Sequence, residues 1–169
     1  MKKVILLLSF IVSAALFGGY DLKIDGKFRN LNDNGLPENW YISDIDMVKT
    51  VPLKGEKYPA LLIDSSNKNI FIRSRNAFPV DKKLFLKTEA DFSGSGSGFI
   101  GVEVFNKYGK KIALKKLKTF VVTNNHKEVE SKIKISEISP ECAAIKIVIG
   151  INKNSVVKVW DIDSETDDD

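Results

Sequence analysis

The sequence predicts an all-β fold, an antiparallel β-sandwich of the jelly-roll type, and three observations carry this prediction. Short stretches with apolar residues at every second position recur along the chain, which is the period of half-buried strands. Residues that favour turns, namely Gly, Pro, Asn and Asp, separate these stretches. After residue 17, no stretch repeats its apolar residues with the period of a helix. Together these features favour one sandwich of about ten short strands.

The stretch from Lys83 to Lys111 shows this pattern most clearly. It contains two alternating segments, at 84–91 and 99–105, and the run SGSGSG at 93–98 separates them. Gly and Ser offer no side chain that can be buried and allow the backbone great freedom. We therefore expect two strands joined by an exposed, mobile connection.

The other expected strands follow from the same alternation. Residues 112–117 form a lysine-rich segment suited to a sheet edge, because lysine opposes unwanted strand pairing. The lone cysteine, Cys142, opens the most apolar segment, so we interpret it as a small core residue; a reactive thiol is the alternative. The acidic residues 164–169 are expected to be a frayed tail. The remaining expected strands are 20–28, 58–64, 69–74, 129–135, 142–151 and 156–163, with two short strands around Asp44.

The first residues have the pattern of a secretory signal peptide. Lys2 and Lys3 precede an apolar run that is too short to span a bilayer, and Gly18 and Gly19 follow it. Within a leader at residues 1–19, we expect cleavage after Ala15 or shortly before Tyr20; an uncleaved anchor is the alternative. The sequence therefore predicts a secreted or periplasmic bacterial protein with no membrane span after cleavage.

Length and composition bound the function. Residues 20–163 are the size of one domain. The net charge is +4 for the 169 residues, and removal of Lys2 and Lys3 brings it to about +2, so nucleic acid is not the expected partner. The single histidine, His126, excludes histidine-rich metal sites, and we expect it to be an exposed loop residue. No cofactor is indicated.

Six short motifs in order resemble the carbohydrate-binding modules of the galactose-binding-like jelly-roll superfamily. None of the motifs is specific alone, but the set spans residues 26–163, nearly the whole of the expected mature chain. The motifs are GKF at 26–28, LPENW at 36–40, GEKYPALLI at 55–63, FPVDKKLFLKTEA at 78–90, VEVFNKYGK at 102–110 and VWDID at 159–163.

The resemblance implies a jelly roll whose concave sheet binds sugars, and a structural calcium ion where the first and last strands meet. This chain departs from the calcium pattern. Arg29 stands where the family has an acidic residue, and Trp160 replaces one of two acidic residues, which leaves Asp161 as the one candidate ligand. Arginine offers no oxygen to calcium. We therefore expect an ion pair between Arg29 and Asp161 and no metal; the alternative is an exposed Arg29 and an Asp161 that caps a turn.

The resemblance and the strand parity together predict a carbohydrate-binding face. Aromatic rings stack on sugar rings, and charged groups form hydrogen bonds with hydroxyl groups. The alternative is an ordinary solvated sheet face. Trp40 is expected to pack in the core, as the resemblance implies; a ring on which a sugar stacks is the alternative. The candidate binding residues are Phe71, Arg73, Arg75, Phe99, Glu103, Phe105 and Lys146 on the sheet, with Tyr41 and Tyr108 at its border.

The sequence therefore predicts a protein that binds a glycan and is not an enzyme. A module that binds another surface or periplasmic protein on the same face is the alternative, because this fold serves both roles. A polysaccharide-degrading enzyme is least favoured, since the strand motif Glu-x-Asp-x-x-Glu of jelly-roll glycosidases is absent. Glu89 and Asp91 share one strand face, but the resemblance places that face on the convex sheet.

Overall fold

The computed structural model describes residues 19–168 and shows a jelly-roll β-sandwich, which confirms the predicted fold class. All strand pairs are antiparallel. One sheet contains β2 (Trp40–Ile42), β5 (Ile70–Ser74), β10 (Ala144–Ile151), the second half of β7 (Phe85–Phe105) and β8 (Lys111–Thr123). The other contains β3 (Val48–Val51), β4 (Ala60–Asp64), β11 (Val156–Asp167), the first half of β7 and β9 (Lys127–Lys134). The short elements are β1 (Tyr20–Asp21), η1 (Ile45–Met47), β6 (Phe78–Pro79) and α1 (Ile135–Ile138).

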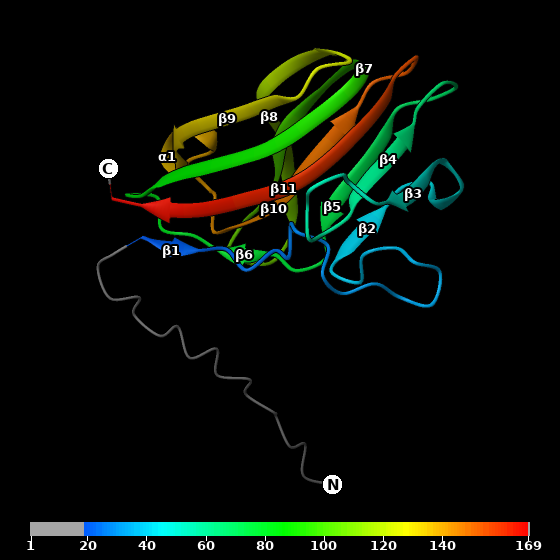
Figure 1. Ribbon diagram of the computed structural model, residues 1–169. Helices are drawn as coiled ribbons and strands as arrows, with labels where there is room; N and C mark the ends of the chain where they lie inside the picture. Colours follow the sequence, from blue (N-terminus) through cyan, green and yellow to red (C-terminus); the bar gives the residue numbers. More distant parts are fainter. Residues whose placement is uncertain (1–18, 169) are drawn as a thin grey trace, which may run out of the picture.

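Strand β7 belongs to both sheets, so the expected loop at SGSGSG is wrong. Its first half pairs with β9 and β11, and its second half pairs with β8 and β10. The glycines lie in the strand where β7 passes from one sheet to the other (Figure 1). A Cβ on Gly94 would lie 2.3 Å from the carbonyl oxygen of Val156, and one on Gly96 would lie 2.2 Å from Cβ of Ser155. These glycines allow two backbones to approach closely, which is a known role of glycine within a strand.

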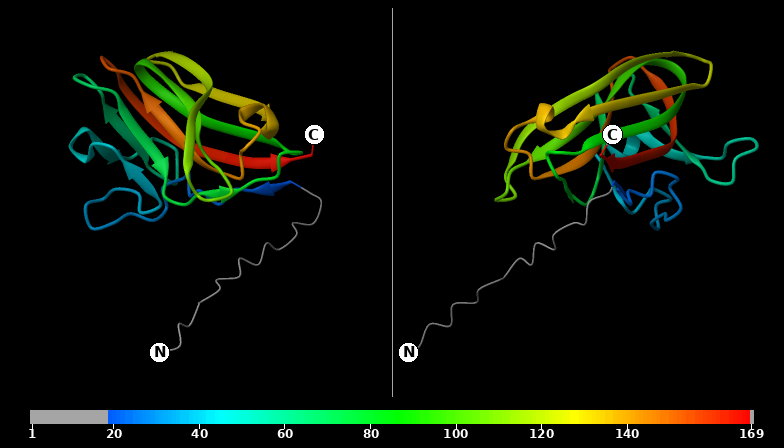
Figure 2. Two further views of the ribbon diagram at one scale, coloured as in Figure 1. Left: turned by 180° about the vertical axis from the view of Figure 1, so that it is seen from behind. Right: turned by 90° about the vertical axis from the view of Figure 1, so that its left-hand side faces the viewer.

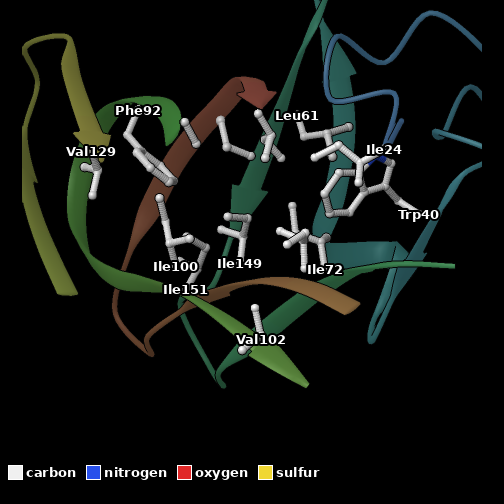
Figure 3. Close-up of a cluster of buried hydrophobic side chains, with 14 of the residues drawn as sticks. Ile24, Trp40, Leu61, Ile72, Phe92, Ile100, Val102, Val129, Ile149 and Ile151 are labelled. Atoms are coloured by element: carbon white, nitrogen blue, oxygen red, sulfur yellow. The ribbon is translucent and has the colours of Figure 1, made fainter. Parts of the chain in front are cut away.

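The hydrophobic core lies between the two sheets (Figure 3). Isoleucines of β10 face it from one side, and residues such as Leu61 and Phe92 face it from the other. Trp40 is 2% exposed, and its ring meets the edge of Phe28 at 6.0 Å between centroids, so Trp40 is a core residue as the sequence predicted. Cys142 is also buried, and burial raises the pKa of its thiol, which favours a packing role over a reactive one.

The C-terminal residues correct a second expectation. Strand β11 continues to Asp167, whereas the sequence suggested a frayed tail from residue 164. Ser164 and Thr166 are each 1% exposed, and Thr166 lies opposite Tyr20 in the pairing of β1 with β11. The acidic side chains alternate with Ser164 and Thr166. Because the buried residues are themselves polar, this segment lacks the apolar alternation by which a strand is predicted. The two ends of the described chain are therefore joined in one sheet.

The expected signal peptide, residues 1–19, lies outside the part of the chain that the structure describes, apart from Gly19. Within residues 19–168, no helix is long and apolar enough to cross a membrane. Secretion and cleavage therefore remain predictions. Figure 2 shows the two sheets of the sandwich from behind and from the side.

Candidate functional site

The outer face of the sheet built on β10 brings most of the candidate residues together. Cross-strand neighbours in a sheet point to the same side. One such row crosses β5, β10, β7 and β8 and consists of Arg73, Val148, Gly101 and Lys116. We call this surface the β10 face. It comprises Tyr41, Phe71, Arg73, Phe99, Gly101, Glu103, Phe105, Leu114, Lys116, Lys146, Val148 and Gly150.

Aromatic rings and cations alternate on this face. The guanidinium carbon of Arg73 lies 5.3 Å from the ring centroid of Tyr41 and 5.8 Å from that of Phe71. Phe71 in turn meets Phe99 at 6.2 Å with an interplanar angle of 63°. Tyr41 is 52% exposed, whereas Phe71 is half-buried. A sheet face with this composition offers ring faces and several hydrogen-bond donors to one ligand.

Glu103 is the only carboxylate in the set that defines the β10 face, and cations already hold it. Its side chain is 7% exposed, Lys111 Nζ lies 2.5 Å from its Oε1, and Arg73 Nε lies 3.4 Å from the same atom. The Arg73 contact has the distance of an ion pair but not the geometry of a hydrogen bond. Glu103 faces away from the core as parity predicted, yet its neighbours cover it. Its role is therefore to position the two cations.

Phe99 lies flat on the backbone of the face. A Cβ on Gly150 would lie 2.3 Å from Cε1 of Phe99, and a Cβ on Gly101 would lie 3.1 Å from Cε2. Phe99 is only 4% exposed, and the ammonium group of Lys116 lies 4.7 Å from its ring centroid. The absence of side chains at Gly101 and Gly150 thus leaves the space that the Phe99 ring occupies. Phe99 is a buried part of the face and does not expose its ring to solvent.

The remaining candidates separate into those on the face and those beyond it. Phe105 is half-buried at one end of the face, with Lys146 Nζ 6.0 Å from its ring centroid. Arg75 is exposed just after β5, and Tyr108 is 81% exposed in the turn between β7 and β8. No ring contact or ion pair among the described residues joins either side chain to the β10 face; Tyr108 contacts Lys107. A role for any of these residues in binding remains a prediction.

A hollow of about 340 Å³ at the other end of the face was not expected from the sequence. Lys116 and Lys127 lie at its wall, with Thr119, Asn152 and Ser97. Lys116 follows Leu114 by two residues on the same face, and the pairing of β7 with β8 shifts just beyond it, between Ile100 and Gly101. Lys127 belongs to β9, in the other sheet, and reaches the hollow because its Nζ donates a hydrogen bond to the Val121 carbonyl at 3.1 Å.

The outer face of the other sheet, which we call the β11 face, carries a different cluster. Trp160 lies opposite Asp91 in the pairing of β11 with β7. His126 Nε2 lies 2.7 Å from Asp91 Oδ1, and the imidazole is tilted against the Trp160 ring at 5.4 Å between centroids. The histidine is exposed as expected, and it ties the turn between β8 and β9 to the sheet. Glu89 also lies on this face.

The expected ion pair between Arg29 and Asp161 is wrong. Lys27 Nζ lies 3.3 Å from Asp161 Oδ1, and the Arg29 guanidinium lies 5.1 Å from the ring centroid of Tyr58. Phe28 has a φ of 51°, so the backbone turns between Lys27 and Arg29. Lys27 therefore lies beside Asp161, whereas Arg29 lies over Tyr58.

The residues at this junction do not fit a calcium site. Both carboxylate oxygens of Asp25 accept hydrogen bonds, from the backbone amides of Arg29 and Asn30, and a lysine holds Asp161. Within residues 19–168, no group of three or more His, Cys, Asp or Glu residues could hold a metal ion. Independence from calcium still has to be measured and stays a prediction.

Comparison with known proteins supports the fold. No family model matches the chain, and no curated protein matches its sequence. Among solved structures, the chain is similar to a CBM22-1 xylan-binding domain from Paenibacillus barcinonensis, with a TM-score of 0.59 and 9% identity over 92% of this chain and 99% of that domain. It is also similar to a family 29 carbohydrate-binding module from Piromyces equi, with a TM-score of 0.51 and 12% identity over 77% and 82%.

Enzymes also share the fold. A cyclase from Fischerella sp. TAU matches with a TM-score of 0.58 and 10% identity, over 88% of this chain and 98% of the cyclase. An α-L-arabinofuranosidase matches with a TM-score of 0.60 and 11% identity, but this chain spans only 27% of its length. At such identities the likeness shows the fold alone. The resemblance inferred from the sequence motifs is thus confirmed as a jelly roll of the kind found in carbohydrate-binding modules.

Proposed function

We propose that this chain is a secreted protein that binds a glycan on the β10 face without transforming it. The observation that carries the proposal is the contact series from Tyr41 through Arg73 and Phe71 to Phe99. A pyranose ring has an apolar C–H face and a rim of hydroxyl groups, so it can be held by a ring and neighbouring donors. The similar domains include one described as xylan-binding and one solved with cellohexaose, which supports this ligand class.

A non-catalytic role is supported by the charges on the face. Hydrolysis of a glycosidic bond generally uses two carboxyl groups on opposite sides of the bond. On the β10 face, Glu103 is the single carboxylate, and Arg73 and Lys111 hold it. It has no second carboxylate on the face to act with.

Binding of another secreted or periplasmic protein is the second candidate, and strand β8 favours it. Within the described chain, β8 pairs with β7 alone, so its other edge is open. Ile112, Leu114 and Val121 expose between 36% and 61% of their surface along this strand. Open edges can pair with an added strand. The lysines of β8, including Lys115 and Lys118, oppose such pairing, which is why the glycan is our first choice.

A glycan array probed with residues 20–169 tests the proposal. We expect binding to at least one plant or bacterial polysaccharide, and Phe105→Ala should weaken it while the protein stays folded. The circular dichroism melt of the variant is the check, because a variant that unfolds would show that Phe105 is a core residue. The absence of binding to any glycan on the array, together with capture of a protein partner that is lost when β8 is altered, would favour the second candidate.

Secretion has its own test. Expression of the full chain in a bacterial host, followed by mass spectrometry of the exported protein, should give a mature N-terminus between Leu16 and Tyr20. An exported chain that retains Met1 would show that the leader is an uncleaved anchor.

A further inference from the structure

The β10 face carries an excess of positive charge that a neutral glycan does not need. Arg73, Lys116 and Lys146 lie on the face, and Glu103 is its only acid. Lys111, next to the face, already pairs with Glu103 together with Arg73. The ammonium groups of Lys116 and Lys146 lie over the rings of Phe99 and Phe105. Lys146 lies opposite Glu103 in the pairing of β10 with β7, but within residues 19–168 neither lysine forms an ion pair, and Glu103 is held by Arg73 and Lys111. Their charge is therefore available to a ligand.

The hollow at one end of the face concentrates this charge. Lys116 stands at one wall, and Lys127 reaches the hollow from the other sheet. None of the residues that line it is acidic. Lys127 Nζ uses one donor on the Val121 carbonyl, at 3.1 Å, and each ammonium group has three donors. At least two donors of Lys127 and all those of Lys116 are therefore free of hydrogen bonds within the described chain.

Neutral polar groups complete the hollow. The Asn152 side-chain amide donates a hydrogen bond of 2.8 Å to Ser97 Oγ, which fixes both side chains at the wall. The exposed Thr119 hydroxyl lies at the same wall. Two ammonium groups with fixed hydroxyl and amide groups form a surface for a small anion that carries several acceptor oxygens. With a volume of about 340 Å³, the hollow is at the lower end of the range for small-molecule sites and large enough for one sugar unit.

We propose that this hollow binds an anionic substituent of an acidic glycan, either the carboxylate of a uronic acid or a sulfate ester, while the rest of the glycan lies along the β10 face. The inference rests on the proposed glycan-binding function and names its ligand class. Charge-assisted hydrogen bonds from Lys116 and Lys127 supply the preference for the acidic sugar over its neutral counterpart.

Matched pairs of glycans test the proposal by isothermal titration calorimetry with residues 20–169. One pair is oligogalacturonate and its methyl ester, and the other is dextran sulfate and dextran, so the members of each pair share a sugar backbone and differ in the charged substituent. We expect the charged member of at least one pair to bind at least about tenfold more tightly than the neutral member. The pair that shows the difference identifies the anion as carboxylate or sulfate.

A double variant and a matched control locate the effect. Lys116→Gln with Lys127→Gln should reduce binding of the charged glycan by about tenfold or more. Lys49→Gln with Lys158→Gln removes the same charge from the β11 face, where both lysines lie opposite Leu62, and should leave binding within about twofold.

The outcomes separate the two proposals. Equal binding of charged and neutral glycans, or equal losses in the two double variants, would overturn the anion site and leave glycan binding intact. Failure of every glycan, here and on the array, would overturn both.

Discussion

The two outer faces of the sandwich arise from the same alternation of side chains but use charge differently. On the β11 face, opposite charges lie beside one another, as in the pairs of Lys87 with Glu89 at 3.1 Å and with Glu130 at 3.8 Å. On the β10 face, Arg73 and Lys111 share the one carboxylate, whereas Lys116 and Lys146 lie beside aromatic rings and form no ion pair within residues 19–168. Lysines also lie near the ring of Phe85 on the β11 face, but one of them, Lys132, pairs there with Asp167. Exposed ion pairs neutralise one another and contribute little stability. Cations over rings are not neutralised by a carboxylate, which is why we propose the β10 face as the binding face.

The net charge of this chain is a poor guide to its partners. Without the two lysines of the expected leader, the chain has a net charge of only about +2. On the β10 face, however, cations outnumber carboxylates, and the electrostatic potential at a surface depends on the charges near it.

Gly150→Val should disrupt the β10 face most strongly. The added Cβ would lie 2.3 Å from Cε1 of Phe99, so the ring must move from its present position. We expect a loss of about 1–3 kcal/mol in the free energy of unfolding, measured by urea denaturation, and weaker glycan binding. The control is Gly109→Asn, because a Cβ there meets no atom within 4 Å and asparagine tolerates the φ of 73°. Unchanged stability of Gly150→Val would contradict the packing described for Phe99.

Glu103→Gln and Glu89→Gln compare one glutamate from each face. Glu103 has a 7% exposed side chain between two cations, whereas Glu89 is 34% exposed. We expect Glu103→Gln to cost about 1–2 kcal/mol of unfolding free energy, a discounted value because Arg73 and Lys111 are partly solvated. Glu89→Gln should cost less than about 0.5 kcal/mol. Urea denaturation measures both, and equal costs would show that the carboxylate of Glu103 has no special structural role.

Tyr41→Ala and Trp160→Ala compare one aromatic ring from each face. Tyr41 borders the proposed site, and Trp160 stacks with His126 on the far face. Loss of the Tyr41 ring should weaken glycan binding by about 1–2 kcal/mol, or roughly fivefold to thirtyfold, whereas loss of Trp160 should leave it unchanged. Affinity electrophoresis in gels that contain the polysaccharide measures this difference. The reverse order would move the site to the β11 face.

His126→Gln should have the smallest effect. The imidazole lies 2.7 Å from Asp91 but is largely exposed, so its loss should cost at most about 0.5 kcal/mol of unfolding free energy. Glycan affinity should not change, because the residue lies on the β11 face. A large loss of affinity in a folded His126→Gln protein would contradict the assignment of function to the β10 face.

Much of the fold could be predicted because alternation reports burial directly. The isoleucines of β10 alternate without interruption, as do Leu86, Thr88 and Ala90 of β7, and the structure buries them. The run SGSGSG was predicted as a loop because glycine is compatible both with a mobile loop and with a close approach of two strands. The sequence does not show that the backbone at Val156 of β11 lies against this run. The strand at Thr166 was not predicted because the buried side chain of this residue is polar, so the sequence shows no apolar alternation there.

The candidate site could be predicted in position but not in detail. Parity placed Phe71, Arg73 and Phe105 on the outer side of the sheet, which is where they lie. It could not show that Glu103 is covered, because burial on an outer face depends on long side chains from other strands. It also missed Lys127, whose ammonium group crosses from the other sheet.

Mapping of a bound glycan by NMR tests the central claim most directly. In a titration of the ¹⁵N-labelled mature chain with a glycan identified on the array, we predict shift changes at the backbone amides of Phe71, Arg73, Gly101 and Val148. The amides of Glu89, Lys158 and Asp163 on the β11 face should not move. Shifts concentrated on the β11 face, or spread evenly over both, would contradict the account.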